Sequence, residues 1–332
     1  MKKNILKKIF IKIAKILNFE IIDQNTFTSP TLNKKLNEKL STLNEKSIVL
    51  PLGEVKITKK IKKVLFIIRV NTNIDIWDQN KKRLFEYPKV EYTLRSLNSI
   101  VKSIKSCEKN YENLDYKIYI IDDSSKNENL SKIEKLLKES KMKCEIIPLS
   151  TGKYKNIIKS QKSTETFSNL ASLLQSFELA KKDTSDLVFF LEDDYIHFDS
   201  MVSETINSYQ RIASQLNRDI IMCPADYPYL YMENNSSNVF IGSERHWRTV
   251  NKTLCTFITS SKILNKYWDN FYKTCLDRND PFEKYLNEIY KSEFCLSPIK
   301  SLSLHMTNIN SSYGLSPFID YEELWESNKY ND

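Results

Sequence analysis

Apolar runs alternate with amphipathic segments along most of the chain after residue 60. Short continuous apolar runs predict buried strands, and apolar residues spaced three and four apart predict helices with one buried face. Four strands are predicted at 64–70, 116–123, 144–149 and from 187 into the carboxylates at 192–194; the helices between them cover about 89–107, 127–140 and 166–182. Apolar strands alternating with helices are typical of an α/β fold, with a mostly parallel central sheet and helices on both faces.

The pattern is less regular after residue 200. A helix is predicted at 201–216, strands are predicted within 219–231 and 245–264, and another helix begins near Pro281. Proline is favoured in the first turn of a helix, where its missing N–H costs nothing. The tail after 300 is predicted as loop, closed by a short amphipathic turn.

The first 17 residues have a different pattern, with lysines between apolar residues at helical spacing. Six lysines occur before the first acidic residue, Glu20. A basic amphipathic helix of this kind suits the surface of an anionic membrane. The alternative is a helix whose apolar stripe packs on its own domain. We favour the membrane interpretation because no acidic residue balances the lysines.

Composition narrows the classes of function. The net charge is +8, but residues 1–63 alone carry +10, so the rest of the chain sums to −2. A near-neutral body argues against a nucleic-acid groove. Only four glycines occur, and neither G-x-G-x-x-G nor a Walker loop is present. Six dispersed cysteines without a C-x-x-C pair indicate reduced thiols in a cytosolic protein. Neither a secretory signal nor an apolar run long enough to span a bilayer is found.

Polar side chains follow three of the predicted strands. Arg69 and Asn71 end the first, Asp122 and Asp123 end the second, and the fourth runs into the triplet 192–194. Ligands bind beyond the carboxyl ends of the strands in open α/β sheets. Three charged strand ends at one edge therefore predict a site, and adjacent carboxylates favour a bound cation.

The run "LVFFLEDD" resembles the D-x-D region of GT-A fold glycosyltransferases, most closely the family 2-like group of bacteria. "IYIIDDSS", about 70 residues earlier, resembles the Asp-Asp-x-Ser end of that fold's second strand. The resemblance covers roughly 62–325 and implies a Rossmann-like GT-A domain that binds Mn²⁺ or Mg²⁺ against the diphosphate of the donor. Hard cations keep waters and phosphates in their shell, so one or two protein carboxylates suffice. The residue pattern predicts a basic helix (1–20) and a linker (21–62), and the resemblance implies a nucleotide-sugar-binding half (63–200) followed by an acceptor half with the tail (201–332).

The resemblance also assigns roles residue by residue. Asp194 becomes a metal ligand, with Glu192 and His305 as further candidates; Glu192 stands where the family more often has Asp. The implied nucleotide-binding residues are Arg69, Asn71, Asp122, Asp123, Asn169, Asp193 and Arg248. A helix cap for Asp122 and Asp123, and a plain salt bridge for Arg69, remain the structural alternatives.

An inverting transferase needs a general base to take the proton of the acceptor hydroxyl. The resemblance points to Asp280, about 25 residues after "TFITSS", with Glu283 and Asp277 as rivals. Helix capping is again an alternative for Asp280. Because Asn279 replaces the family's Glu, inversion or retention stays open.

We therefore expect a metal-dependent glycosyltransferase that moves a sugar from a nucleoside diphosphate sugar to a hydroxyl of a bacterial surface glycan or its lipid-linked precursor. Residues 1–17 would hold it at the inner face of the cytoplasmic membrane. One alternative is a sugar-phosphate nucleotidyltransferase, although "RVNTNIDIW" lacks that class's glycines. The other is a non-catalytic peripheral membrane protein in which the carboxylates are structural.

Overall fold

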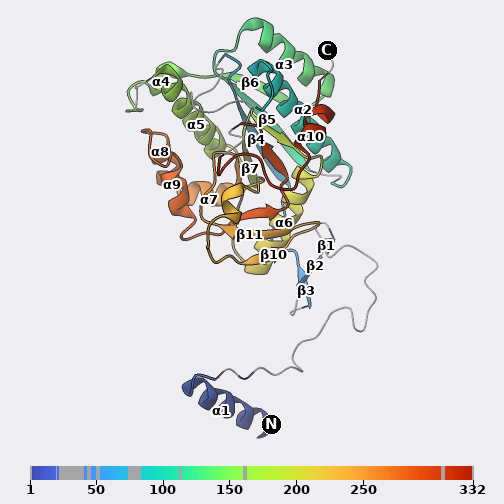
Figure 1. The fold of residues 1–332 in the computed structure, drawn as a ribbon, viewed down its shortest axis with the longest axis vertical. Coiled ribbons are helices and arrows are strands. Elements are labelled where there is room, and N and C mark those ends of the chain that lie inside the picture. The colour runs from blue at the N-terminus through green and yellow to red at the C-terminus, as the bar shows by residue number, and fades with distance from the viewer. Residues whose placement is uncertain are drawn as a thin grey trace.

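The computed structural model describes residues 2–19, 21, 41–42, 46–49, 53–73, 84–111, 114–159, 163–307 and 311–330. Figure 1 shows an α/β body preceded by a separate N-terminal helix. The strands are β1 (Ser41–Thr42), β2 (Lys46–Val49), β3 (Gly53–Lys56), β4 (Lys63–Val70), β5 (Asp115–Asp122), β6 (Cys144–Pro148), β7 (Leu187–Glu192), β8 (Tyr195–His197), β9 (Ile221–Met222), β10 (Val239–Ile241), β11 (His246–Val250), β12 (Phe257–Ser260), β13 (Cys295–Ile299) and β14 (Ser303–His305).

Within the described residues, nine strands form the central sheet in the order β10-β11-β13-β9-β12-β7-β4-β5-β6. The strands β6, β5, β4 and β7 are all parallel, and this is the strand order of doubly wound nucleotide-binding folds. Only β12 and β11 run against the other seven. The predicted α/β fold with a mostly parallel, Rossmann-like sheet is confirmed.

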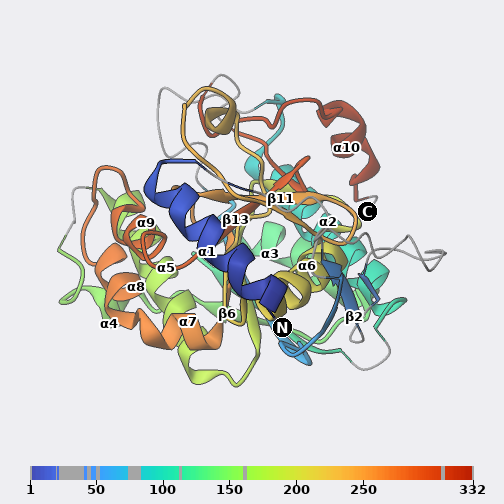
Figure 2. The ribbon, with the colours of Figure 1, turned by 90° about the horizontal axis from the view of Figure 1, so that it is seen from below.

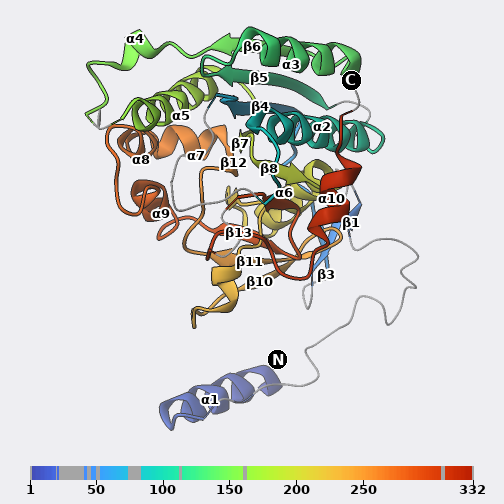
Figure 3. The same ribbon diagram turned by 45° about the horizontal axis from the view of Figure 1, so that its top comes forward.

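Helices cover both faces of this sheet. The helices in the described part of the chain are α1 (Lys2–Ile16), α2 (Lys89–Glu108), α3 (Asn127–Ser140), α4 (Thr151–Tyr154), α5 (Thr164–Lys182), α6 (Met201–Leu216), the 3₁₀ helix η2 (Pro228–Tyr231), α7 (Ser261–Lys266), α8 (Trp268–Thr274), α9 (Lys284–Ile289) and α10 (Tyr321–Ser327), of which α1 lies apart from the sheet. Seen from below, α5, α7, α8 and α9 gather on one side, and α2, α6 and α10 on the other (Figure 2). The same two groups flank the sheet in Figure 3.

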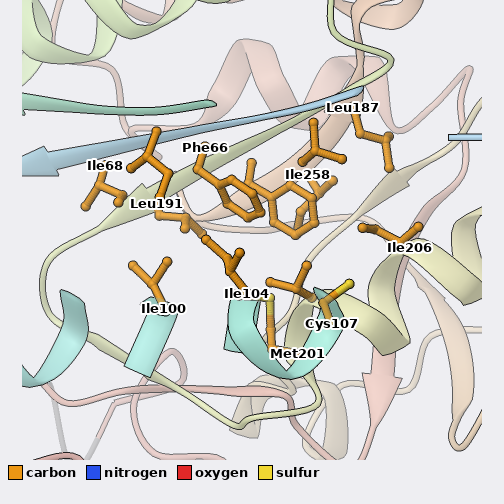
Figure 4. Packing of buried hydrophobic residues seen from close by; sticks show 14 of the residues in the cluster. Phe66, Ile68, Ile100, Ile104, Cys107, Leu187, Leu191, Met201, Ile206 and Ile258 are labelled. Atoms are coloured by element: carbon orange, nitrogen blue, oxygen red, sulfur yellow. The ribbon is translucent and has the colours of Figure 1, made fainter. Parts of the chain in front are cut away.

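The buried residues form a separate core on each face of the sheet. Alternate residues of β4 point to opposite sides, so Phe66 and Ile68 pack against α2 and α6, while Leu65 and Ile67 pack against α5. In the first core, Ile100 and Ile104 of α2 meet the aromatic ring of Phe66 and the neighbouring strand residues (Figure 4). β4 and β7 are therefore buried on both faces, which explains their unbroken apolar runs.

A two-stranded sheet, β8 with β14, brings the tail back to the central fold. In its register His305 lies opposite Tyr195, directly after the carboxylate triplet. The sequence pattern predicted loop here, because a three-residue strand carries too little periodicity to be recognised. This small sheet is what delivers His305 to the predicted site.

The predicted linker 21–62 contains local structure in its described part. β1, β2 and β3 form an antiparallel sheet, and β2 and β3 lie against α6. Just after them, the Thr58 and Lys59 amides donate to Ser214 Oγ, each over 2.9 Å, and the Ile61 amide donates to Gln210 Oε1. Residues 57–61 are thus attached to the body. The domain boundaries themselves stay predictions.

The N-terminal helix is present as predicted, and its apolar stripe is open to solvent. The exposed members are Ile5, Leu6, Ile9, Phe10, Ile13, Ile16 and Leu17, each at least half exposed. Figures 1 and 3 both show α1 away from the sheet and its helices. No helix in the described part of the chain is long and apolar enough to cross a membrane.

Candidate functional site

The carboxyl ends of β4, β5 and β7 meet at one edge of the sheet, as predicted from their polar residues. Val70 lies opposite Asp122 in the β4–β5 ladder, and Arg69 lies opposite Glu192 in the β4–β7 ladder. Parallel pairing in this register places the residues that follow each strand side by side.

Arg69 and Glu192 form an ion pair across β4 and β7. Arg69 Nη2 lies 2.5 Å from Glu192 Oε1, and Nη1 donates to Asn169 Oδ1 over 2.6 Å. Thr256 Oγ1 donates to the other Glu192 oxygen over 3.1 Å. Burial, only partly opposed by Arg69, raises the pKa of Glu192. Both Glu192 oxygens and the Asn169 carbonyl are therefore engaged within the protein, and the roles predicted for these residues toward metal or nucleotide stay predictions.

Asn71 links the second and fourth strand ends. Its side-chain amide donates to Asp123 Oδ2 over 2.8 Å, and its backbone amide donates to Asp193 Oδ2 over 3.3 Å. Burial is the main cause that raises the pKa of Asp123, against the hydrogen bonds from Asn71 and Ser168. Three predicted nucleotide-binding residues are thus brought into one hydrogen-bonded group.

Asp122 lies directly beneath this group and is buried. Its Oδ2 accepts a bond from the Ser125 amide over 3.2 Å, so this carboxylate holds the turn after β5. The cap of α3 is Lys126, without a side-chain cap bond. Asp122 therefore stabilises the turn that precedes α3, but neither Asp122 nor Asp123 is the N-cap residue of the helix.

Asp194 and His305 face each other at the centre of this edge. His305 Nε2 lies 3.3 Å from Asp194 Oδ2, and its Nδ1 lies 2.9 Å from the Tyr313 carbonyl oxygen. Burial opposes ionisation of Asp194, but His305 and then Lys89 more than offset it and bring its pKa below the usual value. For His305, burial acts downward, yet Asp194 raises the pKa above the ordinary value. The two side chains form a largely buried carboxylate–imidazole pair, in which each favours the charged form of the other.

One oxygen of this pair has no partner. Asp194 Oδ1 is buried and accepts no hydrogen bond in the structure. A buried carboxylate oxygen without a donor is costly, and such an atom calls for a missing ligand. A cation beside Asp194 would complete its coordination.

The donor set fits Mn²⁺ or Mg²⁺ held partly by its own waters. Among the described residues, no three acidic, histidine or cysteine side chains come together as a ready-made metal cage. These cations do not need one, since waters and substrate phosphates fill most of their shell. Asp194 and His305 would be the protein ligands, because Glu192 is already bound to Arg69 and Thr256.

Arg248 lies in a different group of side chains, on β11. Its Nη2 is 2.5 Å from Asp226 Oδ1, and its guanidinium carbon is 4.4 Å from the centre of the Tyr231 ring. Asp226 also accepts a bond from Tyr231 OH over 2.5 Å. The structure therefore gives Arg248 a partner that the sequence did not suggest, and its contact with a diphosphate stays a prediction.

The structure separates the candidates for the general base. Asp277 and Asp280 are exposed, in the turn before α9. Glu283 caps α9 and is half-buried. Burial and then the Glu283 charge raise the pKa of Cys255, which also borders Glu192 and Arg69. The Glu283 charge likewise acts on Tyr313, whose carbonyl meets His305. The Glu283 charge thus acts on two residues that border the site, whereas Asp277 and Asp280 are exposed; the role of general base stays a prediction for all three.

Three further residues of the site were missed in the sequence. Lys89 Nζ lies 2.6 Å from Asp193 Oδ1, and Thr93 Oγ1 donates to Asp193 Oδ2 over 2.6 Å. Thr307 Oγ1 lies 2.7 Å from His305 Nε2. The positions 89 and 93 are one helical turn apart, so they share a face, but nothing in the sequence says that this face meets Asp193. Thr307 lies two residues beyond His305, past the end of β14, where the sequence pattern predicted only loop.

Comparison with known proteins gives distant structural likenesses only. No protein-family model matches the chain, and no curated protein sequence is similar to it. Solved structures that align include S. aureus TarS 1–349 in complex with UDP (12% identity, 64% of this chain, 55% of that chain, TM-score 0.36). Others are the galactosyltransferase LgtC with donor and acceptor sugar analogues (11%, 69% and 70%, 0.34) and GalNAc-T7 with UDP, GalNAc and Mn²⁺ (10%, 74% and 43%, 0.39). The chain spans 29% of the longer TarS structure. These scores are too low to carry a functional argument, which rests on the residues of the site.

Proposed function

We propose that this chain is a glycosyltransferase that uses Mn²⁺ or Mg²⁺ and a nucleoside diphosphate sugar. The observation that carries the proposal is the buried, unpartnered Asp194 Oδ1 beside His305, at the sheet edge where three strands end. In open α/β sheets this edge is where nucleotides bind. The acceptor is proposed to be a hydroxyl of a bacterial surface glycan or its lipid-linked precursor.

In this proposal Asp194 and His305 hold the metal. When bound, the metal would offset the negative charge that develops on the departing nucleoside diphosphate. Asp123 and Asn71 face the nucleoside, since carboxylate and amide groups match ribose hydroxyls and base edges. The Arg69–Glu192 pair keeps the ends of β4 and β7 in register beneath them.

Glu283 is our preferred general base. It is half-buried near Cys255 and Tyr313, whereas Asp280 is exposed. A partly desolvated carboxylate is better suited to accept a proton near neutral pH than an exposed one. The choice between inversion and retention follows from whether Glu283 is essential.

The first test is thermal unfolding with UDP, GDP, CMP and dTDP, each with and without Mn²⁺. A ligand at about 100 times its dissociation constant adds roughly 2.7 kcal/mol to the stability of the folded state, which is readily measured. We expect one nucleoside diphosphate to stabilise the protein strongly, and only when Mn²⁺ is present. Equal melting temperatures under all conditions would contradict the proposal and leave the carboxylates as structural groups.

We also propose that α1 lies on an anionic membrane at the cytoplasmic side. Its apolar stripe is exposed, and the lysines around it match anionic headgroups. The protein should sediment with phosphatidylglycerol-containing vesicles but not with neutral ones, and salt should weaken the binding. Phe10→Glu should abolish sedimentation, while Tyr87→Glu, an equal change on the body, should not. Equal binding to neutral vesicles, or none to either, would refute this placement.

A further inference from the structure

Lys89 is the first residue of α2 and carries a positive charge at the edge of the site. Its ammonium lies 2.6 Å from Asp193 Oδ1, and the two side chains are only 13% and 10% exposed. Thr93 Oγ1 and the Asn71 amide donate to the other Asp193 oxygen, over 2.6 and 3.3 Å. Asp193 is therefore held from three directions, and one of them is a positive charge at the edge of the site.

The charge of Lys89 also reaches the proposed metal ligand. It is among the groups that lower the pKa of Asp194, after the contribution of His305. Lys89 and the Asp194–His305 pair thus share one electrostatic environment, although they come from different elements. Any anion bound beside Asp194 would also lie within the field of Lys89.

We propose that Lys89 binds the diphosphate of the donor, next to the metal held by Asp194. This inference rests on the proposed function and names a phosphate-binding residue of that same site. An ammonium has three N–H donors, and the bond from Lys89 Nζ to Asp193 Oδ1 uses one of them. Lysine binds phosphate as a point charge, so it needs no bidentate geometry. With two protein ligands for the metal, a second cation helps to balance the diphosphate.

A phosphate-binding role and a structural role make opposite predictions for the metal. A positive charge near Asp194 repels Mn²⁺ and attracts a diphosphate. Its removal should therefore strengthen the binding of Mn²⁺ alone and weaken that of the nucleoside diphosphate. If Lys89 only supported Asp193, its loss would weaken both.

The test is calorimetric titration of the full chain with MnCl₂ alone, and with UDP, GDP or dTDP at saturating Mn²⁺. Lys89→Met should bind the nucleoside diphosphate at least about tenfold more weakly, since hydrogen bonds to charged groups contribute roughly 1.5–3 kcal/mol. It should bind Mn²⁺ alone as tightly as the wild type or several-fold more tightly. Lys89→Arg should keep most of the affinity for the nucleotide.

Lys105→Met is the matched control, because it removes a lysine charge from the exposed last turn of the same helix. We expect it to shift both affinities by less than about threefold. If Lys89→Met does not fold, the same titrations compare the single variant Asp193→Asn with the double variant Asp193→Asn and Lys89→Met. The side chain at position 193 is neutral in both and needs no cation.

Each outcome decides a different claim. Losses of similar size for Mn²⁺ and for nucleotide in Lys89→Met would show a structural role and overturn the inference. Unchanged nucleotide binding in Lys89→Met would overturn it as well, with the proposed function intact. A wild type that binds no nucleoside diphosphate would overturn the proposed function and this inference with it.

Discussion

The Asp194→Asn variant should lose Mn²⁺-dependent nucleotide binding and at least about a thousandfold of any transfer rate. Asparagine has nearly the same shape but lacks the charge that holds a divalent cation. A metal that stabilises a departing diphosphate contributes several kcal/mol, and each 1.36 kcal/mol is a factor of ten in rate. The measurement is the melting temperature with nucleotide and Mn²⁺, followed by the rate of nucleotide release from the donor sugar.

Asp186→Asn is the matched control for this variant. Asp186 lies just before the other end of β7, is exposed, and accepts bonds from the Lys62 and Lys63 amides. The amide oxygen of asparagine can accept the same bonds, so binding and rate should stay at the wild-type level. Retained Mn²⁺-dependent binding in Asp194→Asn would rule out Asp194 as the metal ligand.

The Arg69→Met variant should be destabilised by about 3 kcal/mol. The Arg69 side chain is 9% exposed, and its removal leaves Glu192 partly buried without its cation. Breaking a buried ion pair at one side costs more than the pair contributes, because the remaining charge stays desolvated. Urea unfolding measures the difference in the free energy of unfolding.

Removing Glu192 as well should restore part of this stability. In Arg69→Met with Glu192→Gln no charge is left unpaired, so we expect a smaller loss than in the single variant. The deficit of Arg69→Met should also shrink as the pH falls. Arg69 lowers the pKa of Glu192 against the effect of burial, so without Arg69 the folded-state pKa lies further above the unfolded one, and the variant gains more stability than the wild type as acid protonates Glu192. A deficit that is constant between pH 8 and pH 5 would contradict this reading.

The first half of the fold could be read from the sequence because its central strands, β4 and β7, are buried on both faces. Each crossover joins a continuous apolar run to an amphipathic helix, and α3 occupies the predicted residues 127–140. The strands β8, β10, β13 and β14 were not recognised. They are three to five residues long, and strands this short carry almost no periodic signal.

The sequence by itself determined which strands end in charged residues, and therefore that Arg69, Asn71, Asp123 and Asp194 meet at one sheet edge. Parallel pairing makes that consequence nearly automatic. Only the tertiary structure decided which side chains at this edge already have partners. Glu192 is bound to Arg69, while one oxygen of Asp194 has no hydrogen-bond donor. Only the structure placed Lys89 on Asp193. These contacts join residues about a hundred positions apart, and long-range contacts follow from helix packing on the sheet, which no local pattern encodes.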